Sequence, residues 1–184
     1  MDNRWTLSLL VQDIPGVMSQ VARLFSRKGY NIHSITSGAS HREGVTRMTI
    51  VITSEIGTAE QIAAQCRKLI PVLAVKVLQQ PLVEMECTLV KVQAETRVQR
   101  EEIMQVATVF RSNIIDLGKD TMILSLLGDE EKTEAFLKLL DDFAILEIVR
   151  TGTIALERGR PTIFDNQKLK EEYNYGKNVL REGL

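Results

Sequence analysis

The stretch QDIPGVMSQVARLF, residues 12–25, decides the fold because it joins two different kinds of element. From Val17 onward its apolar residues recur every three or four positions, which predicts an amphipathic helix over residues 15–28. Residues 4–12, which precede it, are strand-like, and residues 31–38 return to a strand after it. The stretch is therefore the crossover of a strand–helix–strand unit.

The pattern continues outward to residue 80. Residues 45–53 and 72–79 read as two further strands around a helix within residues 57–70. Thr58 and Gln61 fit a capping box at the start of this helix. Its expected core stripe is Ile62, Cys66, Leu69 and Ile70. The order up to this point is βαββαβ, the ferredoxin-like unit, with its first and third strands in the middle of the sheet.

The same order of elements begins again about 80 residues later. Thr96 and Gln99 form a capping pair there, and acidic residues open the last helix, where the helix dipole favours them. The expected strands are 85–94, 113–118, 121–128 and 144–156, and the expected helices are 96–110 and 129–143. The fold class is therefore α+β, with two tandem ferredoxin-like (βαββαβ) domains and a C-terminal tail. We expect domains at 1–80 and 81–160 and a tail at 161–184, with a short helix at 166–175.

The strands at 4–12 and 45–53 carry apolar side chains on both faces. Leu7, Leu9, Val11 and Val51 are the clearest examples. A sheet that is apolar on both faces needs a second cover beyond its two helices. We therefore expect a homodimer, formed either by sheet edges that pair or by sheet faces that stack.

Composition excludes several classes of function. The net charge of −1 argues against a general nucleic-acid binder, and no apolar run approaches the ~20 residues that span a bilayer. Cys66 and Cys87 match no metal spacing and read as reduced thiols of a cytoplasmic protein. The two histidines, His33 and His41, form no metal-binding motif, so we expect no metal site in this chain.

Charge is divided unevenly along the chain. Residues 1–80 carry nine Lys and Arg against five Asp and Glu, a net charge of +4. Residues 81–154 carry eight against fourteen, a net charge of −6, and residues 155–184 are close to neutral. This asymmetry suits a charged protein partner, but two separately solvated surfaces would also explain it.

The loop at the start of the first helix admits two interpretations. No Ser, His and acid spacing near it fits a catalytic triad, and DIPGVM lacks the Lys and extra glycines of a phosphate loop. Asp13 as a cap and Pro15 in the first helical turn would explain much of it as a helix start. Gly16 adds something else, because a ligand can lie against a backbone that has no Cβ. Free N–H groups there would bind a carboxylate, and Asn31 would complete a site for an α-amino acid.

These residues also carry a family resemblance. LLVQDIPGVMSQVARLFSRKGYNIHSIT resembles the ACT domain, the amino-acid-sensing module of metabolic enzymes. RLFSRKGYNIHSITSG and RMTIVI, followed by LVKVQA and FRSNIIDLG, resemble the regulatory (small) subunits of acetolactate synthase, also called acetohydroxyacid synthase. The resemblance covers about residues 4–160. The first domain is thus identified as an ACT domain.

The resemblance implies a role in branched-chain amino acid biosynthesis. The family's small subunits have no catalytic residues of their own and bind a large catalytic subunit that uses thiamine diphosphate, Mg²⁺ and FAD. They raise its activity and confer feedback inhibition by valine, sometimes by leucine or isoleucine. Their ACT domains pair, and the effector lies at the dimer interface. A stand-alone tandem ACT regulator of another enzyme or of transcription is the alternative, and a small ferredoxin-like enzyme is a third.

The family's effector site can be carried over residue by residue. The resemblance implies a loop of Asp13, Ile14, Pro15, Gly16 and Val17, an opposite wall of Asn31 and Ile32, and weaker contributions from Val11 and Thr36. The family often has Asn where this chain has Asp13. The second half reads QAETRVQREE where a loop glycine would stand, so we expect no second valine site. His33 is either a pH-sensitive site residue or a surface or interface histidine.

Overall fold

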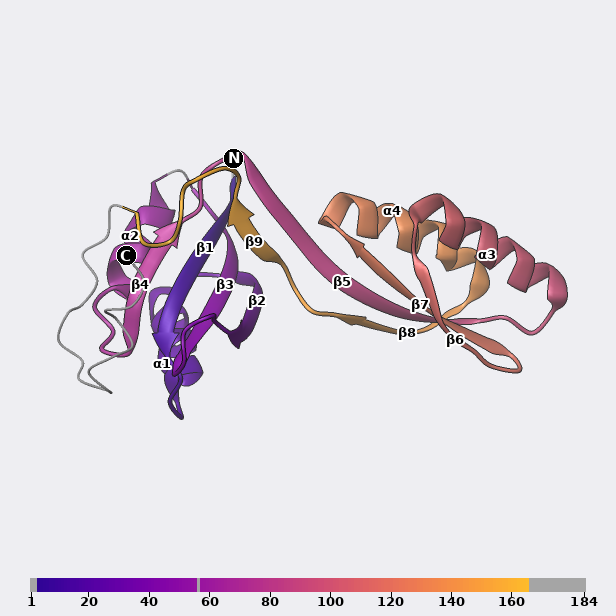
Figure 1. Cartoon of the computed structure of the whole chain (residues 1–184), viewed down its shortest axis with the longest axis horizontal. Helices are drawn as coiled ribbons and strands as arrows, with labels where there is room; N and C mark the ends of the chain where they lie inside the picture. Colours follow the sequence, from indigo (N-terminus) through magenta and orange to yellow (C-terminus); the bar gives the residue numbers. More distant parts are fainter. Residues whose placement is uncertain (1–2, 56, 166–184) are drawn as a thin grey trace. The chain divides into compact units, whose positions relative to one another are not determined.

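The computed structural model describes residues 3–55 and 57–165 and divides the chain into two compact units (Figure 1). The first unit comprises Met1–Val83 with Ala155–Leu184, and the second comprises Glu84–Ile154. Residues 155–165 thus belong with the first unit, although they follow the second in sequence. The functional division at residues 80 and 160 stays a prediction, and the helix expected at 166–175 lies outside the described residues.

The first unit has the expected order of strands and helices. Its elements are β1 (Asn3–Gln12), α1 (Val17–Lys28), β2 (Ile32–Ala39), β3 (Val45–Ser54), α2 (Thr58–Cys66) and β4 (Val72–Val77). The four strands form an antiparallel sheet in the order β2-β3-β1-β4. The first and third strands are therefore central, as the right-handed crossovers required.

The second unit repeats this arrangement. Its elements are β5 (Leu82–Gln93), α3 (Arg97–Phe110), β6 (Asn113–Leu117), β7 (Thr121–Gly128), α4 (Glu130–Leu140), the 3-10 turn Asp141–Phe143 and β8 (Ile145–Arg150). The order β6-β7-β5-β8 matches that of the first sheet, so the prediction of two tandem ferredoxin-like folds is confirmed. The single strand expected at 144–156 was wrong. The chain turns at Gly152, where φ is +82°, and a separate β9 (Ile154–Glu157) pairs with β5.

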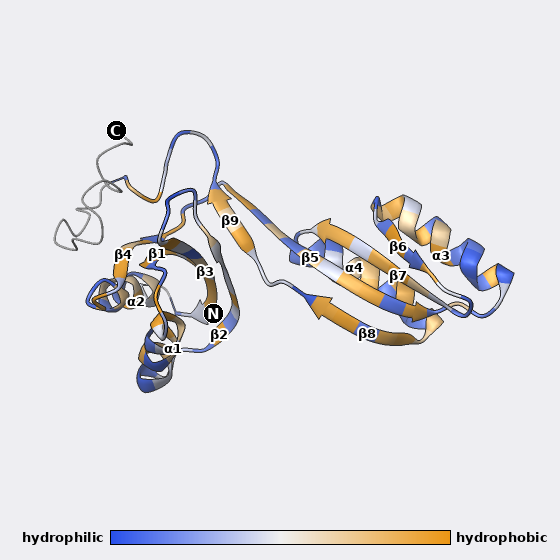
Figure 2. Cartoon of the chain, turned by 60° about the horizontal axis from the view of Figure 1, so that its bottom comes forward, coloured by the Kyte–Doolittle hydropathy of each residue, from blue (hydrophilic) through white to orange (hydrophobic). Residues whose placement is uncertain are grey.

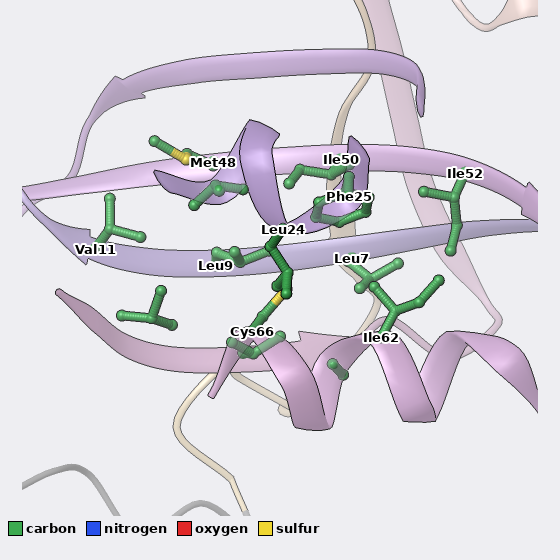
Figure 3. Close-up of a cluster of buried hydrophobic side chains, with 14 of the residues drawn as sticks. Leu7, Leu9, Val11, Leu24, Phe25, Met48, Ile50, Ile52, Ile62 and Cys66 are labelled. Carbon is green, nitrogen blue, oxygen red and sulfur yellow. The ribbon is translucent and has the colours of Figure 1, made fainter. Parts of the chain in front are cut away.

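The first core lies between the sheet and its two helices. Leu7, Leu9 and Val11 are fully buried on this face, where they meet Phe25 of α1 and Ile62 of α2 (Figure 3). Burial of each such side chain contributes about 1.5–3 kcal/mol. Ile62 and Cys66 belong to the expected stripe of α2 and Leu69 packs against it, but Ile70 was predicted wrongly, because it lies beyond the helix end and is exposed.

The other face of the first sheet is covered by the chain itself. Leu10 and Val51 are buried there, which confirms that apolar residues lie on both faces of β1 and β3. Ile163, from the segment after β9, packs with Leu10, and Phe164 lies against the same cluster. Part of this face therefore has a cover from its own chain, and the expected homodimer stays a prediction.

The second core is built in the same way, but its sheet stays open on one side. Ile103 and Ala107 of α3 are buried, while Val106 and Phe110 pack against this core. On the strand faces that alternate away from this core, Leu89, Leu127 and Val149 remain exposed. Figure 2 shows the hydrophobic colouring that runs along β7 and β8.

Candidate functional site

The loop between β1 and α1 is held by its neighbours in the first unit. The Gln12 N–H donates to the Pro71 carbonyl and the Asp13 N–H donates to the Gly44 carbonyl, both at 2.8 Å. The Ile14 N–H turns back to the Gln12 carbonyl at 3.0 Å. The loop backbone is therefore fixed by two bonds to neighbouring segments and one bond within the loop.

Gly16 is the N-cap of α1 and has a left-handed backbone, with φ +82° and ψ −2°. A side chain here would be strained, and no atom lies within 4 Å of the place a Cβ would occupy. The sequence alone explains Gly16 only by the close approach of a ligand. The structure adds a second reason, because the left-handed φ of +82° favours glycine at this position. Two details were wrong: Pro15 lies in the turn before the helix, and no side chain of the loop, Asp13 included, caps it.

The start of α1 leaves donors facing outward. In the described part of the chain, the N–H groups of Gly16, Met18 and Ser19 have no protein acceptor, and the Val17 N–H makes a long bond of 3.4 Å to the Ile14 carbonyl. Ile14 is exposed beside them. Free N–H groups and the positive end of the helix dipole are suited to hold a carboxylate, and Ile14 is suited to an aliphatic side chain.

Asn31 is positioned by the way α1 ends. Gly29 is the left-handed C-cap, and the Tyr30 N–H donates to the Phe25 carbonyl at 3.1 Å. The Tyr30 ring packs edge-on against Phe25 with a centroid distance of 6.2 Å. Tyr30 thus anchors the chain directly before Asn31, which is exposed, and Ile32, which is half-buried at the start of β2.

One protomer does not bring its loop and its Asn31 together. Ile32 pairs with Ile52, and Ile52 pairs with Trp5, so Asn31 lies at the Trp5 end of the sheet. The loop follows Gln12 at the opposite end. Gln12 comes seven residues after Trp5 along β1, a span of about 23 Å at ~3.3 Å per residue. The two halves of the expected site are therefore separated by most of the length of the sheet.

The remaining expected residues differ in what they can contact. Val11 is fully buried beneath the loop and Val17 is almost fully buried, so both support the backbone from within the core. Thr36 pairs with Thr49 on the face away from the helices and is half-buried. His33 is exposed at the register shift between Ile32 and Ser34.

The starts of α3 and α2 can be compared with the uncapped, left-handed start of α1. Thr96 accepts from the Gln99 N–H, and the Gln99 side chain accepts from the Thr96 N–H, so the predicted capping box of α3 is confirmed. The box predicted for Thr58 and Gln61 was wrong, because α2 begins after Gly57, which has φ +87° and no capping side chain. A left-handed glycine at a helix start thus occurs twice in the first unit.

Sequence reasoning missed the residues that fix the loop. Gly44 supplies the carbonyl that holds Asp13, and it has φ +69° at the end of the SHREG turn. Pro71 supplies the second anchor from the turn before β4. A glycine closing a polar turn was visible in the sequence, but its pairing with the loop depends on the register of β1 and β3.

The described residues contain no cluster of His, Cys, Asp and Glu that could hold a metal ion. Burial raises the pKa of the Cys66 thiol to about 11, with a smaller opposing effect from Arg67, so this thiol is a neutral core group. Within residues 3–55 and 57–165, no helix has the length and apolar character needed to cross a membrane.

Family comparisons match both halves of the chain. Residues 7–74 match the family described as the AHAS small subunit-like ACT domain. Residues 85–159 match the family described as the small subunit of acetolactate synthase. The two matches follow the order of the two ferredoxin-like folds.

Individual relatives agree along most of the chain. A probable acetolactate synthase small subunit of Methanothermobacter thermautotrophicus is 42% identical over 158 residues, covering 85% of this chain and 94% of that one. The acetolactate synthase small subunit of Mycobacterium leprae is 40% identical over 84% of this chain and 91% of its own. The crystal structure of the small subunit from Thermotoga maritima superposes with a TM-score of 0.81 at 38% identity, over 86% and 99% of the two chains.

Proposed function

Because the chain belongs to the acetolactate synthase small-subunit family, we propose that it raises the activity of a large catalytic subunit and makes that subunit sensitive to valine. Membership of the family implies a regulatory role and a large-subunit partner. The 42% identity to a relative across 85% of the chain is the observation that carries this proposal. Thiamine diphosphate, Mg²⁺ and FAD are assigned to the catalytic partner, and none of them to this chain.

The effector site is proposed to form between two copies of the chain. In the described sheet β2 is an edge strand, and its Ala39 end lies beside Thr46, at the same end of the sheet as the loop. Antiparallel pairing of two β2 edges about a two-fold axis would place Asn31 of one copy beside Ala39 of the other. Asn31 of one protomer then comes to the sheet end that carries its partner's loop, which removes the separation seen within one protomer.

The position of α1 favours this edge over the other. α1 connects β1 to β2 and therefore lies over the β2 side of the sheet, while α2 connects β3 to β4 and lies over the β4 side (Figures 1 and 2). Of the two starts with a left-handed glycine, only that of α1 would face the partner across the β2 edge. This distinguishes Gly16 from Gly57.

The proposed contacts follow the chemistry of an α-amino acid. The carboxylate would lie on the free N–H groups at the start of α1, and the ammonium group on the carboxylate of Asp13 or the side-chain oxygen of Asn31. The aliphatic side chain would contact Ile14 and Ile32. Valine that bridges the protomers would favour one dimer arrangement, and a tenfold change in activity needs only about 1.4 kcal/mol of differential binding.

Reconstitution tests the function itself. The purified chain is added to its cognate large subunit, and acetolactate formation is measured with and without valine, leucine and isoleucine. The proposal expects activation by the chain and inhibition by at least one of the three amino acids. Absence of activation at saturating small subunit contradicts the regulatory assignment and leaves the stand-alone ACT regulator.

Complementation between protomers tests where the site lies. Gly16→Asp and Asn31→Ala chains are mixed, refolded together and assayed with the large subunit. A shared site predicts one intact site per mixed dimer, made from the normal loop of one chain and the normal Asn31 of the other, so valine inhibition returns in part. A site within one protomer would leave both chains defective, and the mixture would stay resistant.

A further inference from the structure

The helix-free face of the first sheet holds a cavity of about 650 Å³. Its floor is β1 and β3, and its outer wall is the segment that follows β9, which returns to the first unit in Figure 1. Two hydrogen bonds hold this wall in place. Arg47 Nη2 donates to the Ala155 carbonyl at 3.4 Å, and Lys76 Nζ donates to the Thr162 carbonyl at 2.9 Å.

Three arginines line the cavity without an acidic partner. Arg42 lies with its guanidinium carbon 4.2 Å from the centre of the Phe164 ring, and Arg47 makes the single hydrogen bond to Ala155. Arg160 is exposed and pairs with no group in the described part of the chain. None of the three forms an ion pair with a carboxylate of the described residues.

The carboxylate in the cavity wall is already occupied. Glu157 Oε2 lies 2.5 Å from Lys76 Nζ, and Glu157 Oε1 accepts from the Gln79 N–H at 2.8 Å. Both groups are well shielded, so Lys76 offsets the charge of Glu157. The cavity keeps a surplus of three positive charges. Burial also lowers the pKa of Arg47, as expected for a cation that lacks a counter-charge.

The cavity also has an apolar side. Leu10 and Ile163 are buried in its wall, and Phe164 presents the ring that Arg42 covers. A volume of 650 Å³ falls within the ~300–1,000 Å³ of small-molecule sites and greatly exceeds one inorganic anion. The lining therefore suits a molecule with an anionic end and an apolar end.

We propose that this cavity binds a small phosphorylated metabolite, with its phosphate on Arg42, Arg47 and Arg160 and its apolar part against Phe164. A phosphate monoester carries about −1.5 to −2 charges near neutral pH, which suits three guanidinium groups better than the single charge of a carboxylate. Planar guanidinium forks also match its oxygens in paired hydrogen bonds. The site lies on the opposite face of the sheet from α1 and is separate from the proposed valine loop.

Isothermal titration of the full chain with phenyl phosphate, inorganic phosphate and phenylacetate, at constant ionic strength, tests the proposal. Phenyl phosphate should bind saturably at one site per chain, several-fold more tightly than inorganic phosphate, because its ring reaches the apolar wall. Phenylacetate should bind roughly tenfold more weakly than phenyl phosphate, because it carries less charge. Failure of phenyl phosphate to bind saturably, or equal binding of phenylacetate, overturns the proposal.

Matched variants locate the binding. Arg160→Gln changes an exposed residue and should weaken phenyl phosphate roughly fivefold. The triple variant Arg42→Gln, Arg47→Gln and Arg160→Gln should not bind it. Arg27→Gln removes the same charge from the end of α1, away from the cavity, and should bind as the unmodified chain does. Normal binding by Arg160→Gln, or an equal loss in Arg27→Gln, contradicts the assignment.

Discussion

The two units share one fold but begin their first helices in different ways. α1 starts at a left-handed Gly16 with no capping side chain, and three of the first N–H groups around it have no acceptor among the described residues. α3 starts at Thr96, whose side chain accepts from the Gln99 N–H at 3.2 Å, while Gln99 Oε1 accepts from the N–H groups of Glu95 and Thr96. The start of α3 satisfies its own donors, whereas the start of α1 leaves N–H groups that a ligand could use. This difference, within one topology, is the reason for proposing the effector site at the start of α1 and not at the start of α3.

The helix-free faces of the two sheets differ in a second respect. In the first unit the chain's own Ile163 and Phe164 pack on part of this face and border a cationic cavity. In the second unit it carries Leu89, Leu127 and Val149, which remain exposed in the described structure. Exposed apolar rows of this kind are typical of surfaces that contact other proteins. The repeated fold thus supports two unlike surfaces.

The largest expected effect comes from Gly16→Asp. A carboxylate at this position adds bulk and negative charge where the effector carboxylate is proposed to bind. We expect at least a tenfold rise in the valine concentration that halves activity, about 1.4 kcal/mol, with activation of the large subunit retained. The measurement is acetolactate formation in the reconstituted enzyme across a valine titration.

Two controls separate charge from backbone strain in that experiment. Gly57→Asp introduces the same residue at a left-handed helix start with φ +87°, over the β4 side of the same sheet face, and should leave valine inhibition unchanged. Gly16→Asn has a similar shape and tolerates the left-handed backbone, but it adds no charge, so its effect should be smaller. Equal resistance in Gly57→Asp would show that strain alone disrupts inhibition.

Much of this comparison could be predicted from the sequence, and the exceptions have physical reasons. The periodicity gave the order of elements, and the Thr96–Gln99 box was visible because its bonds are local in sequence. The start of α2 was predicted wrongly because the left-handed turn at Gly57 replaced the Thr58 cap. Gly57 and Thr58 are adjacent, and either could form the start of α2. Their residue types alone do not decide which one does.

The candidate site shows the same limit over longer distances. The loop around Gly16 and the strand start at Asn31 could be named from the sequence, but their separation depends on the register of β1, β3 and β2. The cationic cavity could not be predicted, because Arg47 and Arg160 are far apart in sequence. They line one cavity only because residues 155–165 return to the first unit.

The next largest expected effect is a dependence of the unfolding free energy on pH that comes from Cys66. Cys66 lies in the core of the first unit, so the effect reports the unfolding of that unit. Its folded pKa of about 11 lies above the ordinary thiol value of 9.0. Between these values the unfolded chain loses the thiol proton while the folded chain keeps it, so stability falls as pH rises. We expect a loss of about 1 to 1.5 kcal/mol from pH 8 to pH 10 that is absent in Cys66→Ala. Urea unfolding under reducing conditions measures the difference.

Cys87→Ala is the matched control for this thiol. Cys87 is only partly buried in the second unit, and its replacement by alanine controls for the loss of a thiol outside the first core. If the two units unfold in separate steps, only the step of the first unit should respond to Cys66→Ala. An identical pH slope in Cys66→Ala and the unmodified chain contradicts the burial of an un-ionised thiol.

The smallest expected effect tests the start of α3. Thr96→Ala removes the oxygen that accepts from the Gln99 N–H, and it should lower the unfolding free energy by about 1 kcal/mol without changing valine inhibition. Thr108→Ala is the control on the same helix, because Thr108 bonds only within the helix, to the Met104 carbonyl, and alanine is the better helix former. Thermal unfolding compares the two variants. A change in valine sensitivity in Thr96→Ala would place effector binding at the start of α3 as well. It would then contradict the distinction between the helix starts of the two units.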